Sequence, residues 1–144
     1  MRLIAFLSAM LVANMAFADG DAEIKYRQAV MKAVGGHMAS MGAILRGRTH
    51  LGDLDVHANA MAELAQIVPT VFPEGSGDGK TEALPAIWEK ADDFKKHVDE
   101  YVKAANDMAD AANSGEMGRI GPAIQALGQS CKGCHDNFRE EHDH

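Results

Sequence analysis

This sequence lacks the features that mark several large classes of protein. Only two of its 144 residues are cysteines, too few for a disulfide scaffold. Basic residues are a minority, 14 against 21 acidic ones, which gives a net charge of −7. Nucleic-acid-binding and polybasic membrane-surface proteins need a basic face, so the composition argues against both. We find no strand-like run, internal repeat or glycine-rich phosphate loop, and helical periodicity is the main structural signal.

The N-terminus is the one stretch with a long apolar run. Arg2 precedes an uncharged segment from Leu3 to Phe17, and Ala16-Phe17-Ala18 has the small-x-small pattern of a signal-peptidase site. A membrane anchor is the alternative, but the run is short for a span and contains Ser8 and Asn14. We therefore predict a cleaved signal peptide over residues 1–18, a mature domain over residues 19–144, export to the periplasm and no membrane anchor.

The two cysteines lie in the most informative motif of the chain, Cys131-Lys132-Gly133-Cys134-His135. Cys-x-x-Cys-His is the attachment pattern of a c-type haem. On a helix, residues at i, i+3 and i+4 share one face, so both thiols and the imidazole can reach a single flat cofactor. The motif predicts one haem c bound covalently through Cys131 and Cys134, with His135 as an axial ligand of the haem iron.

Three other interpretations of the motif fit less well. A thioredoxin-type dithiol normally lies beside a βαβ pattern, which is absent here. A structural zinc site needs four ligands, and His142 and His144 follow nearby without the second cysteine pair that is usual in such sites. A disulfide between cysteines three residues apart would close a very small loop and stabilise little through chain entropy.

Apolar periodicity predicts four helices in the mature chain. The first three cover about residues 22–45, 56–71 and 85–112, with Pro85 in the first turn of the third. The fourth carries the Cys-x-x-Cys-His motif and ends near Phe138, and Pro122 could mark its first turn. Gly35 and Gly36 interrupt the first helical pattern. Two explanations are left open, a bend in the helix or a close contact with its backbone. Short connections favour an all-α, antiparallel four-helix bundle in a single domain.

An exported chain with four helical stripes and this motif near its C-terminus resembles the cytochrome c′ family, the class II c-type cytochromes. The likeness includes Lys25-Tyr26-Arg27-Gln28, Pro85-Ala86-Ile87-Trp88 and the Cys-Lys-x-Cys-His-Asp site. The resemblance implies an antiparallel four-helix bundle, often a homodimer, with a covalent haem between the helices and His135 as proximal ligand.

The resemblance also implies that the residue over the distal face of the haem is Met31. A thioether can ligate iron, and His/Met coordination raises the potential and suits electron transfer. Similar proteins with methionine at this position include both six-coordinate and five-coordinate ones. The other interpretation of Met31 is an ordinary core methionine that does not contact the iron. Met38 lies about 10 Å further along the helix and His37 points away from that face, so neither is expected to bind the iron.

Two polar residues complete the predicted haem-binding set. Arg27 lies one helical turn before Met31, and the resemblance implies that it compensates a haem propionate, with Gln28 as a neighbouring polar contact. A solvated arginine on the helix flank is the alternative.

The function predicted first is a periplasmic electron carrier, not an enzyme, with iron held by His135 and Met31 and with redox proteins as partners. The alternative is a five-coordinate protein that binds small gases such as nitric oxide or carbon monoxide. A peroxidase ranks third, because we find no distal His/Arg pair for acid–base catalysis.

Overall fold

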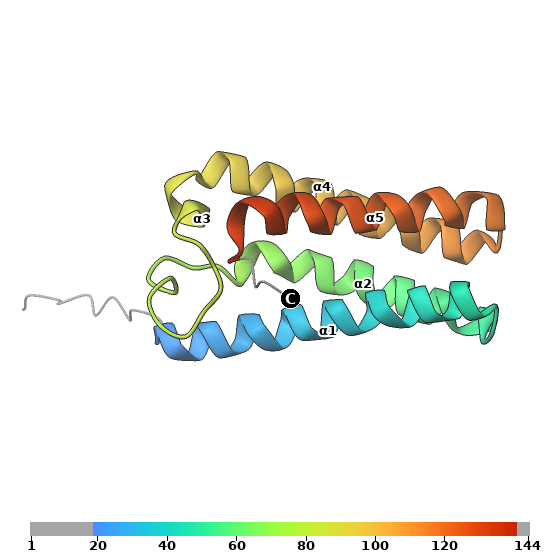
Figure 1. Cartoon of the computed structure of the whole chain (residues 1–144), viewed down its shortest axis with the longest axis horizontal. Coiled ribbons are helices and arrows are strands. Elements are labelled where there is room, and N and C mark those ends of the chain that lie inside the picture. The colour runs from blue at the N-terminus through green and yellow to red at the C-terminus, as the bar shows by residue number, and fades with distance from the viewer. Residues whose placement is uncertain (1–18, 141–144) are drawn as a thin grey trace, which may run out of the picture.

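The chain folds as an all-α bundle of four long helices, as predicted (Figure 1). The computed structural model describes residues 19–140, so the predicted signal peptide and the histidines at 142 and 144 lie outside the described part. The long helices are α1 (Gly20–Gly47), α2 (Leu54–Ile67), α4 (Ala91–Ser114) and α5 (Met117–Phe138). Short elements are the 3-10 turns η1 (Leu51–Asp53) and η2 (Val68–Thr70) and the single-turn helix α3 (Ala86–Glu89).

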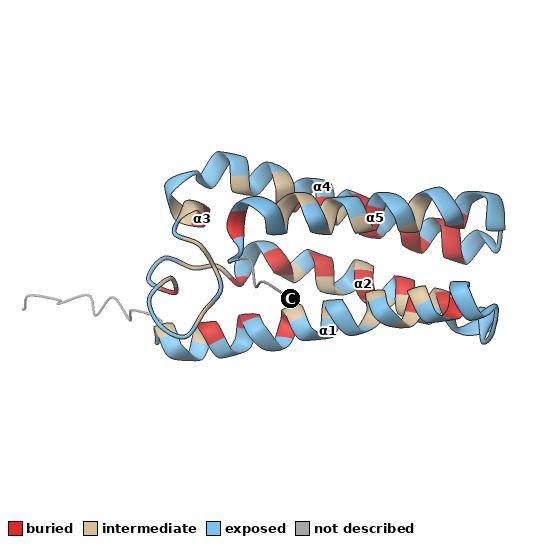
Figure 2. Cartoon of the chain, viewed as in Figure 1, coloured by how far each residue is buried: buried red, intermediate tan, exposed pale blue. Residues whose placement is uncertain are grey.

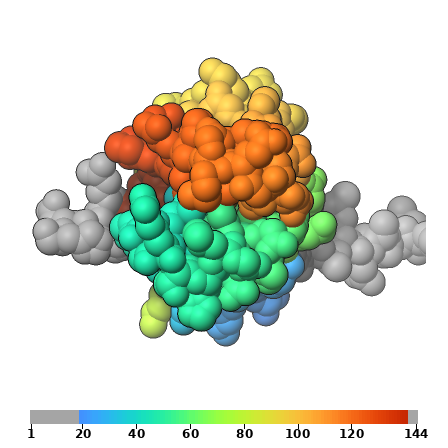
Figure 3. Space-filling model, turned by 90° about the vertical axis from the view of Figure 1, so that its right-hand side faces the viewer, coloured from blue at the N-terminus to red at the C-terminus, as the bar shows by residue number. Residues whose placement is uncertain are grey.

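Local sequence signals explain where the helices begin and end. The Asp19 carboxylate accepts a hydrogen bond of 3.1 Å from the Asp21 N–H, which caps the start of α1. At the end of α4, Gly115 adopts a left-handed φ of 69°, which glycine reaches without steric penalty. The α1–α2 connection and the α4–α5 connection then lie together at one end of the bundle (Figure 3).

The third predicted helix is not continuous. The prediction of one helix over residues 85–112 is wrong, because the chain breaks at Lys90, where φ is −122° and ψ is 50°. The Trp88 indole N–H donates to the carbonyls of Phe72 and Pro73, each at 3.2 Å, so tertiary contacts fix α3 as a separate turn. At the fourth helix, the start lies at Met117 and Pro122 is inside the helix, not in its first turn.

The core runs along the middle of the bundle, where α1 packs on α2, α2 on α4, and α4 on α5 (Figure 2). Its largest fully buried apolar side chains are three methionines, Met41, Met61 and Met108, together with Leu127 and Val71. Methionine adapts to irregular gaps between helices. Within residues 19–140, we find no helix long and apolar enough to cross a membrane.

Gly35 and Gly36 do not interrupt α1, which is continuous from Gly20 to Gly47. A Cβ atom at either position would meet nothing within 4 Å, so a close backbone contact is not their role. Gly35 instead lies on the wall of the cavity described next.

Candidate functional site

A cavity of about 970 Å³ lies between α1 and the α4–α5 pair, with the η2–α3 segment across one end. This volume is at the upper end of the range usual for cofactor sites. Most of its wall is apolar, with contributions from Met31, Val34, Met38, Leu45, Phe72, Val98, Ile124 and Phe138. A large flat apolar cofactor fits such a space.

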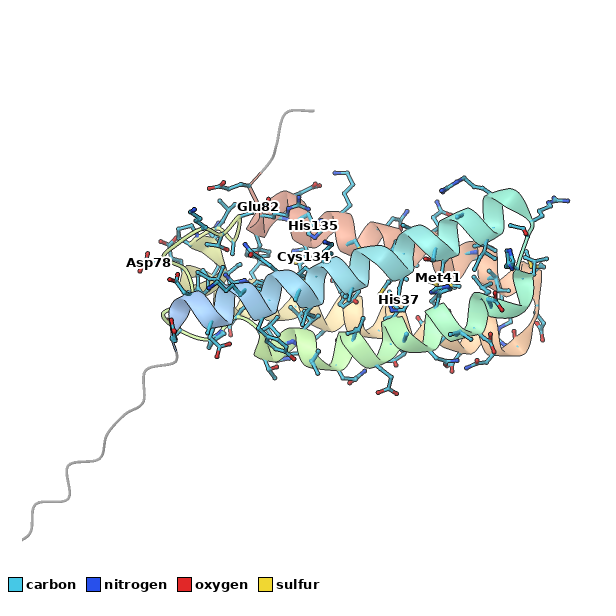
Figure 4. All side chains as sticks on the ribbon, turned by 90° about the horizontal axis from the view of Figure 1, so that it is seen from below. His37, Met41, Asp78, Glu82, Cys134 and His135 are labelled. Carbon is cyan, nitrogen blue, oxygen red and sulfur yellow. The ribbon has the colours of Figure 1, made fainter. Side chains whose placement is uncertain are left out.

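All six residues predicted to bind the cofactor line this one cavity. Arg27, Gln28 and Met31 come from α1, and Cys131, Cys134 and His135 come from α5. Figure 4 shows Cys134 and His135 near the end of the bundle that carries Glu82. The face-sharing argument for the Cys-x-x-Cys-His motif thus matches its position in the folded chain.

The two thiols are half-buried and free. Burial raises the pKa of the Cys131 thiol, and burial together with the neighbouring Cys131 raises that of Cys134 to about 11. Both thiols are therefore protonated at neutral pH, and the protonated form is slow to oxidise. Within residues 19–140, no group of three or more His, Cys, Asp or Glu side chains is arranged to hold a metal ion. His142 and His144, which the zinc interpretation included, lie outside these residues.

His135 is the only imidazole on the cavity wall among the described residues. Loss of hydration lowers its pKa, and the charge of Arg139 lowers it further, against a smaller opposing effect of Asp136 and Glu82. A lower pKa keeps the imidazole neutral over a wider pH range. Neutral imidazole is the form that binds iron.

Arg139 and Glu82 were missed by the sequence analysis. Arg139 follows the last residue of α5, and its backbone N–H donates to the His135 carbonyl at 3.2 Å. Its Nε donates to Glu82 Oε2 at 2.8 Å. Both residues line the cavity beside His135. The spacing of four residues between His135 and Arg139 is visible in the sequence and could have indicated Arg139. Nothing in the sequence indicates the contact of Arg139 with Glu82, 57 residues away.

Arg27 is buried, with only 3% of its surface exposed, so the alternative of a solvated arginine is wrong. Its Nη1 donates to Ser76 Oγ at 2.8 Å and to the Val71 carbonyl at 3.3 Å. Its Nη2 donates to the Ser76 carbonyl at 2.8 Å and to Thr81 Oγ1 at 2.9 Å. Burial lowers the pKa of the guanidinium, although Glu23 opposes this effect. Arg27 thus anchors the segment between η2 and α3 against α1.

Gln28 is exposed at the edge of the cavity, and its Nε2 donates to the Lys80 carbonyl at 2.9 Å. Both polar residues of α1 therefore hold the same loop. Both residues also line the cavity. Their contact with a haem propionate remains a prediction.

An aromatic cluster closes the loop end of the cavity. Phe94 packs edge-on against Phe72 at 4.9 Å between ring centroids and against Phe138 at 5.2 Å. The Arg27 guanidinium carbon lies 5.0 Å from the centroid of the Phe72 ring, within cation–π range. These rings join α4, α5 and the η2–α3 segment at the cavity wall.

Tyr101 is a further residue on the cavity wall. It is buried, and its hydroxyl donates to Met61 Sδ at 3.2 Å. Burial raises the pKa of this phenol, with a further contribution from Cys131. Tyr101 is therefore neutral at the cavity wall.

The sequence model of the family described as cytochrome c′ matches residues 22–139. The chain belongs to the cytochrome c′ family. A cytochrome c′ from Pararhodospirillum photometricum is 42% identical over 125 residues, which covers 85% of this chain and all of that relative.

Solved cytochrome c′ structures share the bundle. The protein from Shewanella frigidimarina superimposes with a TM-score of 0.82 at 33% identity, covering 87% of this chain and 99% of that one. A variant of the Alcaligenes xylosoxidans protein in complex with nitric oxide has a TM-score of 0.80 at 25% identity, covering 88% and 99%. Another variant of it, with carbon monoxide bound, has a TM-score of 0.79 at 25% identity, covering 87% and 99%.

The family carries one covalently attached haem c, and the prediction of this cofactor is confirmed. The chain has only two cysteines, Cys131 and Cys134, and both lie on the wall of the same apolar cavity. The protein is therefore a haem c-type cytochrome. Bound haem supplies an iron that changes oxidation state and can take small ligands.

Proposed function

We propose that this protein is a periplasmic cytochrome c′ that binds small gases such as nitric oxide or carbon monoxide and transforms no substrate. In this proposal His135 is the proximal ligand of the iron and Met31 shields the distal face without ligating it. The electron-carrier function, predicted first from the sequence, becomes the second candidate.

The shape of the cavity on the Met31 side carries the proposal. The cavity wall follows α1 from Arg27 to Arg46, about 28 Å at 1.5 Å per residue, which is longer than a haem is wide. Beyond Met31 the wall includes Gly35, Ala39 and Gly42. Gly35 follows Met31 by one helical turn, and a Cβ atom there would meet nothing within 4 Å, so it leaves space beside the half-buried Met31 thioether into which the thioether can move when a diatomic ligand enters.

The solved relatives support this reading, because variants of one similar cytochrome c′ hold nitric oxide or carbon monoxide. His135 is suited to the proximal role, since its lowered pKa keeps the imidazole neutral. The Arg139–Glu82 ion pair lies beside it and fixes the C-terminal turn of α5. The Glu140 N–H donates to the Glu82 carbonyl at 2.8 Å, which holds the same turn from the backbone.

One observation favours the second candidate. Met31 lines the same cavity as His135 from the facing helix, and a thioether there is a competent sixth ligand. If it ligates the iron, the protein is a low-spin electron carrier with restricted access for gases.

Replacing Met31 by alanine separates the two candidates. If Met31 only shields the iron, Met31→Ala leaves the high-spin spectrum unchanged and speeds carbon monoxide binding to the ferrous protein, measured by stopped-flow absorbance. Met38→Ala is the matched control, because Met38 lines the cavity two turns further along α1. Conversion of a low-spin spectrum to a high-spin one in Met31→Ala alone would establish the electron-carrier candidate instead.

A further inference from the structure

Two histidines from different helices form a hydrogen bond outside the haem cavity. His37 of α1 and His57 of α2 place their Nδ1 atoms 3.0 Å apart, with ring centroids at 5.3 Å. Both side chains are half-buried, and neither lines the cavity. The sequence predicts that His37 points away from the helix face that carries Met31, and nothing in it indicates His57 as the partner.

This hydrogen bond lies where α1 is held to the rest of the bundle. Among the long helices, α1 packs extensively only on α2, because the haem cavity separates it from α4 and α5. Within residues 19–140, the bond between His37 and His57 is the one side-chain hydrogen bond that joins α1 to α2 (Figure 4). Gly35 and Met38, on either side of His37 in the sequence, line the cavity. A movement of this part of α1 away from α2 therefore moves the distal wall of the cavity.

The bond requires that one of the two Nδ1 atoms carries no proton. In the neutral pair, one imidazole donates its Nδ1–H and the other accepts at Nδ1. A first added proton can bind to Nε2 of the donating ring, which keeps the bond and makes it charge-assisted. A second proton has to bind to the accepting Nδ1. Two N–H groups and two positive charges then face each other across 3.0 Å with no acceptor between them, so the second proton drives the rings apart.

No carboxylate of α2 compensates the second charge. Asp53 lies four residues before His57, but its carboxylate oxygen is 3.6 Å from Nδ1 of His50. The other two acidic residues of α2, Asp55 and Glu63, are turned away from His57 by about 120° or more around the helix. Within the part of the chain that the structure describes, neither imidazole of the pair has a carboxylate at ion-pair distance.

The other elements around the pair supply no compensating charge either. On α1, the charge nearest to His37 in the sequence is the exposed Lys32, which is also positive. α4 meets this part of α2 through neutral amides, because Asn113 bonds to Asn59 at 3.0 and 3.1 Å. Burial lowers the pKa of His37, and the charge of His57 lowers it further. The pair therefore takes up its second proton below the ordinary histidine pKa of 6.5.

We propose that the hydrogen bond between His37 and His57 is a pH-sensitive clamp on α1, which holds the distal wall of the haem cavity at neutral pH and releases it on acidification. This inference rests on the gas-binding function proposed above. Release of α1 from α2 lets the Met31 thioether move aside more easily, so small gases reach the iron faster in acid. Protons then regulate gas binding through a pair of side chains that does not line the haem cavity.

The test is the rate of carbon monoxide binding to the ferrous holoprotein, measured by stopped-flow absorbance from pH 7.5 to pH 5.0. If the released arrangement binds the gas more readily, the rate follows its population, and we expect a rise of at least about threefold in the parent. The midpoint of the rise should lie below pH 6.5. In His57→Gln, an amide oxygen can accept from His37 Nδ1 at any pH, and His37→Gln offers the same acceptor from α1. Neither variant should show the rise.

His50→Gln is the matched control. His50 is an exposed histidine whose charged neighbour is Asp53, and it takes no part in the bond between His37 and His57. This variant should keep the pH dependence of the parent. A parent rate that does not change with pH, or a rise that persists in both His37→Gln and His57→Gln, would overturn the proposal.

Urea unfolding of the ferric protein tests the clamp without any gas. The unfolded chain takes up protons at the ordinary histidine pKa, whereas the folded pair takes up its second proton only at lower pH. Stability is therefore lost as the pH falls from 6.5 through the folded pKa. Between pH 7.5 and pH 5.0, the urea midpoint should fall further in the parent than in His57→Gln, and equal falls would overturn the clamp. A larger fall in a parent that binds no carbon monoxide would overturn the gas-binding function and leave the clamp in place.

Discussion

Replacing Arg27 by methionine should destabilise the protein by about 3 kcal/mol. Methionine keeps an unbranched apolar chain over Phe72 but removes every donor. Ser76 Oγ still donates to the Pro73 carbonyl and Thr81 Oγ1 still accepts from the Ala83 N–H, so the hydroxyls keep partners.

The carbonyls of Val71 and Ser76 lose the Arg27 donors. An unsatisfied buried acceptor costs about 1–3 kcal/mol, so two give about 2–6 kcal/mol. Removal of a desolvated charge offsets part of this loss, which brings the expected value to about 3 kcal/mol.

The assay is urea unfolding of the ferric protein, followed by haem absorbance and helical circular dichroism. Gln28→Met is the matched control, because Gln28 is exposed and makes one hydrogen bond to the same loop. It should change the free energy of unfolding by no more than about 0.5 kcal/mol. An Arg27→Met variant as stable as this control would refute the anchoring role.

The same variant tests the contact with a propionate. If Arg27 also compensates a propionate, loss of its positive charge lowers the midpoint potential, since ferric iron becomes less unfavourable. Lost stability at an unchanged potential would assign Arg27 to the loop alone.

Three further outcomes are expected. Cys131→Ala or Cys134→Ala should each leave at most one thioether bond to haem, and denaturing mass spectrometry that finds two would contradict the attachment site. Gly35→Leu should slow carbon monoxide binding, because Gly35 lines the cavity, whereas Gly36→Leu should not, because Gly36 does not line it; equal rates would contradict the proposed distal space. Removing haem should lower the thermal midpoint, since an apolar cavity of about 970 Å³ loses its contents, and an unchanged midpoint would count against haem as a core element.

The helices and the haem motif could be predicted because their signals are local. Residues three and four apart share a helix face, so the stripes define four helices and the Cys-x-x-Cys-His spacing defines one face of α5. The cap residues Asp19 and Gly115 are likewise local signals, one at the start of α1 and the other at the end of α4.

What could not be predicted depends on contacts between distant segments. Arg27 reaches partners 44 to 54 residues away, and the sequence shows only a cation in an amphipathic stripe. The break at Lys90 follows from Trp88 bonding to carbonyls 15 and 16 residues earlier. The pairing of His37 with His57 requires the register of α1 against α2. No local pattern encodes these three contacts.

The visible spectrum of the unmodified ferrous protein, recorded before and after carbon monoxide is added, tests the central claim most directly. If the protein is a gas-binding cytochrome c′ in which Met31 only shields the iron, we expect a high-spin, five-coordinate spectrum. Carbon monoxide should convert this spectrum fully to that of a low-spin form. A spectrum that is low-spin from the start and unchanged by carbon monoxide would show that the sixth position is already taken. That result would contradict the gas-binding function.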